Sequence, residues 1–140
     1  MKKQQIYSIL LVLIIVLMLP IFNKLLKNTN MPFKNLKLED VKSIDLYLQP
    51  PNKEIVINNE KNIKDIVDAL TKLVIKTEES PKVDYSGQLV TYSLNKNNGD
   101  SVKVKVYSPY VIIDEKIYKA NYEICDVLNL LGNDILEKNK

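Results

Sequence analysis

The only thiol in this chain of 140 residues is Cys125, and the chain contains no histidine, tryptophan or arginine. A cysteine becomes a catalytic nucleophile when a neighbouring base or positive charge lowers the pKa of its thiol. Because histidine is absent, no imidazole can act as that base or ligate a metal. We therefore interpret Cys125 as a small core residue of a C-terminal helix. Redox chemistry is the alternative if the start of that helix is exposed.

Carboxylates could also catalyse a reaction, since two of them held about 5 to 9 Å apart can hydrolyse a glycosidic bond. The chain has 17 acidic residues, with adjacent pairs at Glu39-Asp40, Glu78-Glu79 and Asp114-Glu115. Each pair falls in an expected loop or at an expected element end, where water solvates charge. A calcium-loop spacing begins at Asn95, but its twelfth position is Val106 instead of glutamate. We predict no catalytic residue, no metal site and no cofactor.

Tyrosine is the most distinctive enrichment in the chain. Six of the eight tyrosines fall within 38 residues, at Tyr85, Tyr92, Tyr107, Tyr110, Tyr118 and Tyr122. Tyrosine favours strands, so packing within a sheet is one interpretation. The other is a binding surface, because amphipathic rings around an amide suit the recognition of a peptide or glycan. The residues that we predict for this surface are Tyr85, Gln88, Tyr107 and Tyr110.

The elements that must position these residues alternate between strand and helix periodicity. Residues 44–48 and 55–57 repeat with period two and predict a strand pair joined by a turn at 50–52. Asn59 can cap a helix over 60–73, and a strand is expected at 74–77 before a break at 78–81. A hairpin over 111–118 and a helix capped by Asn121 and stopped by Gly132 complete the pattern. These elements predict an α+β fold, an antiparallel sheet of five to six strands with two helices on one face.

Residues 88–107 allow a prediction of strand register. A three-residue loop at 97–99, with Gly99 at positive φ, pairs Leu94 with Val102, Tyr92 with Val104 and Val90 with Val106, so that all six face one core. A two-residue loop would split these apolar residues between the two faces. The other face, with Thr91, Ser93, Lys103 and Lys105, is expected to meet water, and Tyr107 lies on it.

Residues 6–22 form an apolar stretch with Lys2 and Lys3 before it and Lys24 after it. At a rise of 1.5 Å per residue, its 17 residues span about 26 Å, and continuation to residue 26 reaches about 30 Å, the thickness of a membrane's hydrocarbon core. Neither a small-residue cleavage site nor a cysteine follows the stretch. We predict an uncleaved transmembrane signal anchor over 6–26; a buried helix of a soluble protein is the alternative.

Charge is distributed unevenly along the chain. Residues 1–30 carry four lysines and no acid, whereas residues 31–140 carry 16 lysines against 17 acids. A nucleic-acid binder needs clustered cations, so we expect no nucleic-acid partner. The anchor predicts a cytoplasmic N-terminus at 1–5, a connector at 27–35 and one extracytoplasmic domain at 36–136.

Several short motifs resemble those of an uncharacterised family of small membrane-anchored extracytoplasmic domains of low-GC Gram-positive bacteria. The resemblance covers about residues 33–131 and rests on Phe33-Lys34-x-Leu36, Pro50-Pro51, Tyr85-Ser86-Gly87-Gln88, the run at 108–113, Tyr118-Lys119 and Tyr122-Glu123-x-Cys125. It implies a sensing role, because related domains are attached to membrane-bound regulatory proteins, but it transfers no functional residue. The family often has Asn-Gly where this chain has Asp114-Glu115, which puts a tight turn there in question.

The sequence thus predicts a single-pass protein of the cell membrane with a non-enzymatic sensor or interaction domain outside the cell. Its expected partners are the membrane and another envelope protein or wall component. A carboxylate-based wall hydrolase is one alternative and predicts a cleft that holds two acids. An inhibitor of a secreted enzyme is another and predicts a rigid loop that protrudes at residues 50–52.

Overall fold

The computed structural model describes residues 2–27, 29–77 and 87–140. By their internal contacts these form two compact units, Met1–Asn30 and Met31–Lys140.

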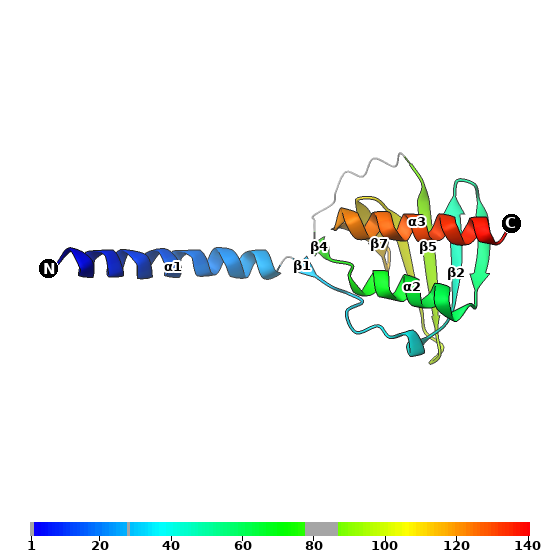
Figure 1. Cartoon of the computed structure of the whole chain (residues 1–140), viewed down its shortest axis with the longest axis horizontal. Helices are drawn as coiled ribbons and strands as arrows, with labels where there is room; N and C mark the ends of the chain where they lie inside the picture. The colour runs from blue at the N-terminus through cyan, green and yellow to red at the C-terminus, as the bar shows by residue number, and fades with distance from the viewer. Residues whose placement is uncertain (1, 28, 78–86) are drawn as a thin grey trace. The chain divides into compact units, whose positions relative to one another are not determined.

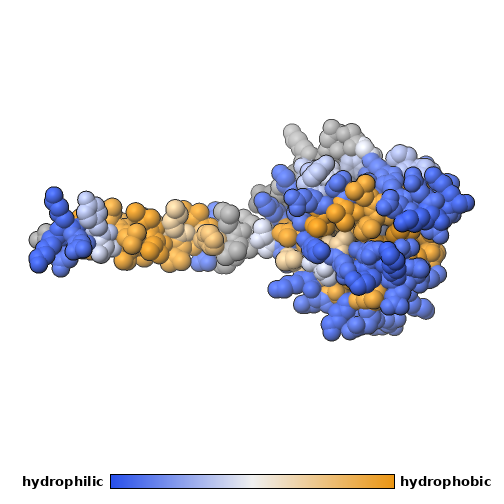
Figure 2. All heavy atoms as spheres, in the orientation of Figure 1, coloured by the Kyte–Doolittle hydropathy of each residue, from blue (hydrophilic) through white to orange (hydrophobic). Residues whose placement is uncertain are grey.

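The N-terminal unit is built on helix α1 (Lys3–Lys27), which is followed by a two-residue strand, β1 (Thr29–Asn30). Apolar side chains cover the visible side of the helix between its lysine-bearing start and its end (Figure 2). The segment Lys3–Lys24 has 22 residues, none of them buried within the unit, and measures about 33 Å along the helix axis. It is therefore long and apolar enough to cross a membrane.

The second unit is an α+β domain in which one antiparallel sheet carries two α-helices (Figure 1). In chain order its elements are η1 (Leu38–Asp40), β2 (Val41–Gln49), β3 (Lys53–Ile57), α2 (Glu60–Thr71), β4 (Ile75–Thr77), β5 (Leu89–Lys96), β6 (Ser101–Tyr107), β7 (Tyr110–Ile113), β8 (Lys116–Ala120) and α3 (Tyr122–Lys138). The strands of this unit lie in the order β4-β8-β7-β6-β5-β2-β3. With β1, the described residues contain eight strands instead of the predicted five to six, together with a 3-10 helix that was not predicted.

Helices α2 and α3 lie over the same face of the sheet (Figure 1). The sheet contributes alternate residues to the core on this face, among them Ile44, Leu46, Val90, Tyr92 and Val104, all fully buried. The stripe of α2 contributes its own buried residues, Ile63, Ile66, Val67, Ala69 and Leu70. Helix α2 begins where the sequence predicted, because the side chain of Asn59 accepts a hydrogen bond from the backbone N–H of Asn62 at 3.1 Å.

The three strand pairs that the sequence predicted are present. Strands β2 and β3 pair around the turn at 50–52, with Leu48 opposite Lys53. Strands β5 and β6 pair in the predicted register, with Tyr92 opposite Val104, and Gly99 has φ +92° in the three-residue loop. The register prediction is confirmed. This register places the apolar residues of both strands on the face that contacts the core.

The hairpin of β7 and β8 has a two-residue loop, since Ile113 lies opposite Lys116. Asp114 and Glu115 have φ values of +49° and +65°. The tight turn therefore exists without Asn-Gly, although two residues with side chains must adopt the left-handed backbone conformation that glycine and asparagine adopt most easily.

The prediction that α3 ends at Gly132 was wrong. Gly132 does not stop the helix, which continues to Lys138, and its buried residues are Cys125, Leu128, Gly132, Ile135 and Leu136. A Cβ atom at Gly132 would lie 2.9 Å from Cγ1 of Val90 and 3.1 Å from the hydroxyl oxygen of Tyr92. The glycine thus permits close contact between helix and sheet.

Asn121 precedes α3 as predicted, but its side chain does not cap the helix. Its Oδ1 accepts a hydrogen bond from the backbone N–H of Val74 at 2.9 Å, and its Nδ2 donates to the backbone oxygen of Lys72 at 3.3 Å. The side chain is engaged because the segment between α2 and β4 runs beside the start of α3.

The close contact at Gly132 predicts the effect of Gly132→Ala. We expect this substitution to lower the free energy of unfolding by about 1 to 3 kcal/mol, because the new methyl group must displace a fully buried, β-branched valine. Urea unfolding of the full-length protein in detergent micelles, followed by tyrosine fluorescence, measures the change. Asp134→Ala, at an exposed position of the same helix, is the control and should change little. Stabilisation by Gly132→Ala, as at an exposed helical glycine, would contradict the packing role.

The turn of β7 and β8 predicts a gain in stability. Replacing Glu115 by glycine should raise the free energy of unfolding by about 1 kcal/mol, because glycine adopts positive φ without steric conflict. The same unfolding measurement applies. The matched control is Glu123→Gly in the first turn of α3, which should lower the free energy by about 1 kcal/mol. A loss of stability in Glu115→Gly would show that the glutamate side chain stabilises the turn.

Candidate functional site

The candidate site lies on the face of the sheet opposite α2 and α3. Successive residues of a strand point to opposite faces, so residues that alternate with the core positions gather here. Strand β2 contributes Asp45, Tyr47 and Gln49 between its buried Ile44, Leu46 and Leu48. Among the described residues of 31–140, both α-helices lie on the other face, so neither helix covers this one.

The open face is hollowed across four neighbouring strands. The hollow has a volume of about 330 Å³. We call it the sheet groove and define it by its lining residues, which come from β2, β3, β5 and β6: Asp45, Tyr47, Gln49, Glu54, Leu89, Thr91, Ser93, Lys103 and Lys105. Polar and charged side chains predominate, as expected of a surface that meets water.

Strand register arranges the charges of the sheet groove in two rows across the strands. In the first row Asp45 lies opposite Ser93, and Ser93 lies opposite Lys103. In the second row Glu54 lies opposite Tyr47, followed by Thr91 and Lys105. Carboxylates therefore occupy one side of the groove and ammonium groups the other, with one hydroxyl-bearing residue between them in the first row and two in the second.

The carboxylate side of the groove is partly organised by hydrogen bonds. The Nδ2 atom of Asn95 donates to Oδ2 of Asp45 at 3.0 Å and to Oγ of Ser43 at 3.2 Å. Among the residues that the structure describes, ion pairs join Lys37 to Glu39, Lys61 to Asp65 and Lys64 to Asp68, and none of these lines the groove. The charges of the groove therefore do not pair with one another across it.

The structure brings together two of the four predicted binding residues. Tyr107 and Tyr110 lie directly opposite each other at the end of the β6–β7 hairpin, on the open face. The expectation that the open face is wet at Tyr107 was wrong, because only 6% of this residue is exposed and a large aromatic neighbour stands opposite it. Tyr110 is half-buried. Tyr85 lies outside the described residues.

Gln88 does not join the tyrosines. Its Nε2 atom donates to the backbone oxygen of Pro50 at 2.9 Å and to Oδ1 of Asn133 at 3.1 Å, and its Oε1 accepts from Nδ2 of Asn133 at 2.8 Å. Because Asn133 belongs to α3, this amide lies on the helix-covered face. It connects the start of β5 to α3 and to the turn between β2 and β3.

Four of the nine residues that line the groove were predicted from the sequence to share one face. The hairpin register put Thr91, Ser93, Lys103 and Lys105 on one face, and these residues line the groove. Thr91 is only 8% exposed, contrary to the expectation of a wet face, because this short side chain stands between Tyr47 and Lys105. Asp45, Tyr47 and Glu54 were not considered. Their alternation with apolar residues was visible, but the adjacency of β2 and β5 was not.

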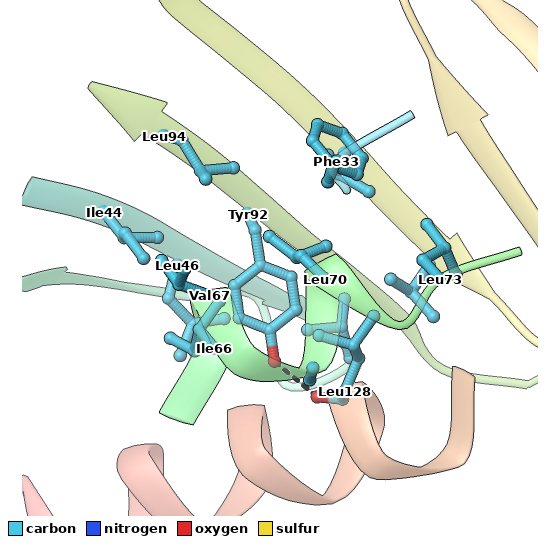
Figure 3. Close-up of a cluster of buried hydrophobic side chains, with 14 of the residues drawn as sticks. Phe33, Ile44, Leu46, Ile66, Val67, Leu70, Leu73, Tyr92, Leu94 and Leu128 are labelled. Carbon is cyan, nitrogen blue, oxygen red and sulfur yellow. Dashed lines mark hydrogen bonds between the residues drawn. The ribbon is translucent and has the colours of Figure 1, made fainter. Parts of the chain in front are cut away.

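The phenol of Tyr92 and the thiol of Cys125 lie in the core on the other face. Tyr92 donates a hydrogen bond from its hydroxyl to the backbone oxygen of Leu128 (Figure 3), and burial raises the pKa of this phenol. Cys125 is fully buried, and burial raises the pKa of its thiol to about 11. Both groups are held in their neutral forms, so neither is activated as a nucleophile.

A second hollow, of about 400 Å³, lies beside the segment that precedes η1. It contains Asp40, whose Oδ2 already accepts a hydrogen bond from the backbone N–H of Lys37 at 3.0 Å. It lacks the opposed rows of charge found in the sheet groove. Within residues 2–27, 29–77 and 87–140, no group of three or more histidine, cysteine or acidic side chains could hold a metal ion.

Comparisons of the chain with protein-family models, with curated proteins and with solved structures found no match. The family resemblance described above therefore stays an expectation.

The burial of Cys125 predicts a thiol that reacts slowly and a stability that depends on pH. At pH 8 we expect iodoacetamide to alkylate the folded chain about 100-fold more slowly than the urea-unfolded chain, because far less thiolate is present. The folded chain keeps its thiol proton between about pH 9 and pH 11, where the unfolded chain loses it, so the free energy of unfolding should fall over this interval. Mass spectrometry of alkylation time courses measures the ratio of rates. Equal rates would favour the redox alternative.

Proposed function

We propose that this protein is a single-pass membrane protein whose α+β domain stands outside the cell and binds an envelope partner through the sheet groove, without catalysing a reaction. Helix α1 supports the anchor, since its apolar segment has the length of a membrane span. The observation that carries the proposed binding role is the groove itself, a hollow on a sheet face that neither α2 nor α3 covers.

Binding is favoured over carboxylate hydrolysis by the surroundings of the two acids in the groove. A general acid at neutral pH needs an apolar environment that raises the pKa of its carboxyl group. Glu54 is exposed to water, and Asp45 is half-buried and accepts a hydrogen bond from Nδ2 of Asn95 at 3.0 Å, so neither carboxyl group lies in an apolar environment. The arrangement suits electrostatic recognition better than proton transfer.

Binding is also favoured over inhibition by a protruding loop. The segment between β2 and β3 contains three residues, Pro50 to Asn52, and the backbone oxygen of Pro50 accepts a hydrogen bond from Gln88. A connection this short, tied back to β5, stays close to the body of the domain.

The buried thiol allows a direct test in cells. Because Cys125 is shielded, the wild-type chain provides a background that maleimides do not label, and single cysteines can be introduced elsewhere. We expect a membrane-impermeant maleimide to label Leu130→Cys, at an exposed position of α3, in intact cells, and to label Lys2→Cys only after permeabilisation. Labelling is measured by gel shift. The opposite pattern would contradict an outward-facing domain.

The same experiment tests occupancy of the groove. Gln49→Cys places a thiol in the groove at an exposed position that carries no charge, and Leu130→Cys is its matched control on the helix face. In the native envelope we expect Gln49→Cys to be labelled about tenfold less than Leu130→Cys, relative to their ratio in purified protein in detergent, since a bound partner shields the groove. An unchanged ratio would contradict binding at this face.

A further inference from the structure

We propose that the sheet groove binds a short oligopeptide of three to four residues with a free amino group and a free carboxylate, extended across the strands. This inference rests on the proposed binding function and specifies its ligand. The peptide's ammonium group lies at Asp45 and Glu54, and its carboxylate lies at Lys103 and Lys105.

The negative and positive charges of the groove lie on different strands. Both carboxylates belong to β2 and β3, and both ammonium groups belong to β6. A ligand with one kind of charge, such as a polyanion, would be attracted to one side of the groove and repelled by the other. A ligand with opposite charges at its two ends is attracted at both sides in one orientation and repelled in the reverse orientation.

The distance between the two charged sides of the groove determines the length of the ligand. Neighbouring strands lie about 4.8 Å apart, so the two strand spacings from Asp45 to Lys103 amount to about 10 Å and the three from Glu54 to Lys105 to about 14 Å. An extended peptide advances about 3.4 Å per residue. Three residues therefore cover the shorter span and four residues the longer one.

Hydroxyl groups form the floor between the charged sides. Ser93 occupies the middle of the first row, and Tyr47 and Thr91 occupy the middle of the second. Ser93 and Tyr47 are half-buried, whereas Thr91 is only 8% exposed, so the hydroxyl groups of Ser93 and Tyr47 are the more accessible ones. A hydroxyl group can donate and accept hydrogen bonds, as the alternating N–H and C=O groups of a peptide backbone require. The volume of about 330 Å³ lies at the lower end of the usual range for small-ligand sites, about 300 to 1,000 Å³, which fits a short peptide and excludes a folded partner from the hollow.

The test uses the full-length protein in detergent micelles and tetra-alanine as the probe, with calorimetric titration as the measurement. We expect tetra-alanine with free ends to bind, and its N-acetylated and C-amidated forms to bind at least about tenfold more weakly, since each loses one charge-assisted contact. Tetra-alanine has no charged side chain, so its binding reports on the two ends alone.

Substitutions in the groove assign each end of the peptide to one side. Glu54→Gln should weaken binding of free tetra-alanine about tenfold but leave its N-acetylated form unaffected, and Lys105→Gln should do the same with the C-amidated form. Lys138→Gln, at the end of α3 on the other face, is the matched control and should leave binding unchanged. Thermal unfolding of each variant verifies that it is folded.

The proposal is overturned if tetra-alanine does not bind at millimolar concentration, or if peptide blocked at both ends binds as tightly as free peptide. The second result would instead indicate an internal segment of a longer chain. Neither result affects the maleimide test of groove occupancy, so failure of this ligand can be distinguished from failure of the proposed function.

Discussion

The domain depends on the close contact between α3 and the centre of its sheet. At Gly132 the helix approaches Val90 and Tyr92 so closely that a single methyl group would clash, and Tyr92 donates its hydroxyl proton to the backbone oxygen of Leu128 on the same helix. This contact buries a polar group with its partner satisfied, which is the condition for a phenol in a core. It also sets the face of α3 that turns inward, and hence the burial of Cys125.

The placement of both helices on one face determines the character of the other. Because α2 and α3 cover the apolar alternation of β2, β5 and β6, the intervening residues of these strands form a face that neither helix covers. These intervening residues carry acids on β2 and β3 and lysines on β6. The core and the candidate site are thus two sides of the same strands, and a change in register would exchange them.

The buried thiol and phenol lie on one face of the sheet, and the charged groups of the groove lie on the other. This division favours binding over catalysis. The thiol of Cys125 and the phenol of Tyr92 lie in the core, where burial raises the pKa of both groups and keeps them protonated. The ionised groups lie on the open face, where water solvates them and where they can attract a charged ligand without the cost of desolvating a deep pocket. Among the residues that the structure describes, the groups whose pKa is raised by burial lie outside the groove.

Features that depend on neighbouring residues could be predicted from the sequence: the apolar length of α1, the Asn59 cap of α2, the paired strands around 50–52, and the register of β5 with β6. Periodicity, capping and turn geometry act over a few residues, so the local pattern suffices. Only the tertiary structure decided the role of Gly132, the contacts of Asn121, the burial of Tyr107 and the composition of the groove. Asp45 and Asn95 are 50 positions apart in the chain, and no local pattern shows that they are neighbours. Strand order and helix approach arise from contacts between distant segments, whose free energy depends on how the whole core packs.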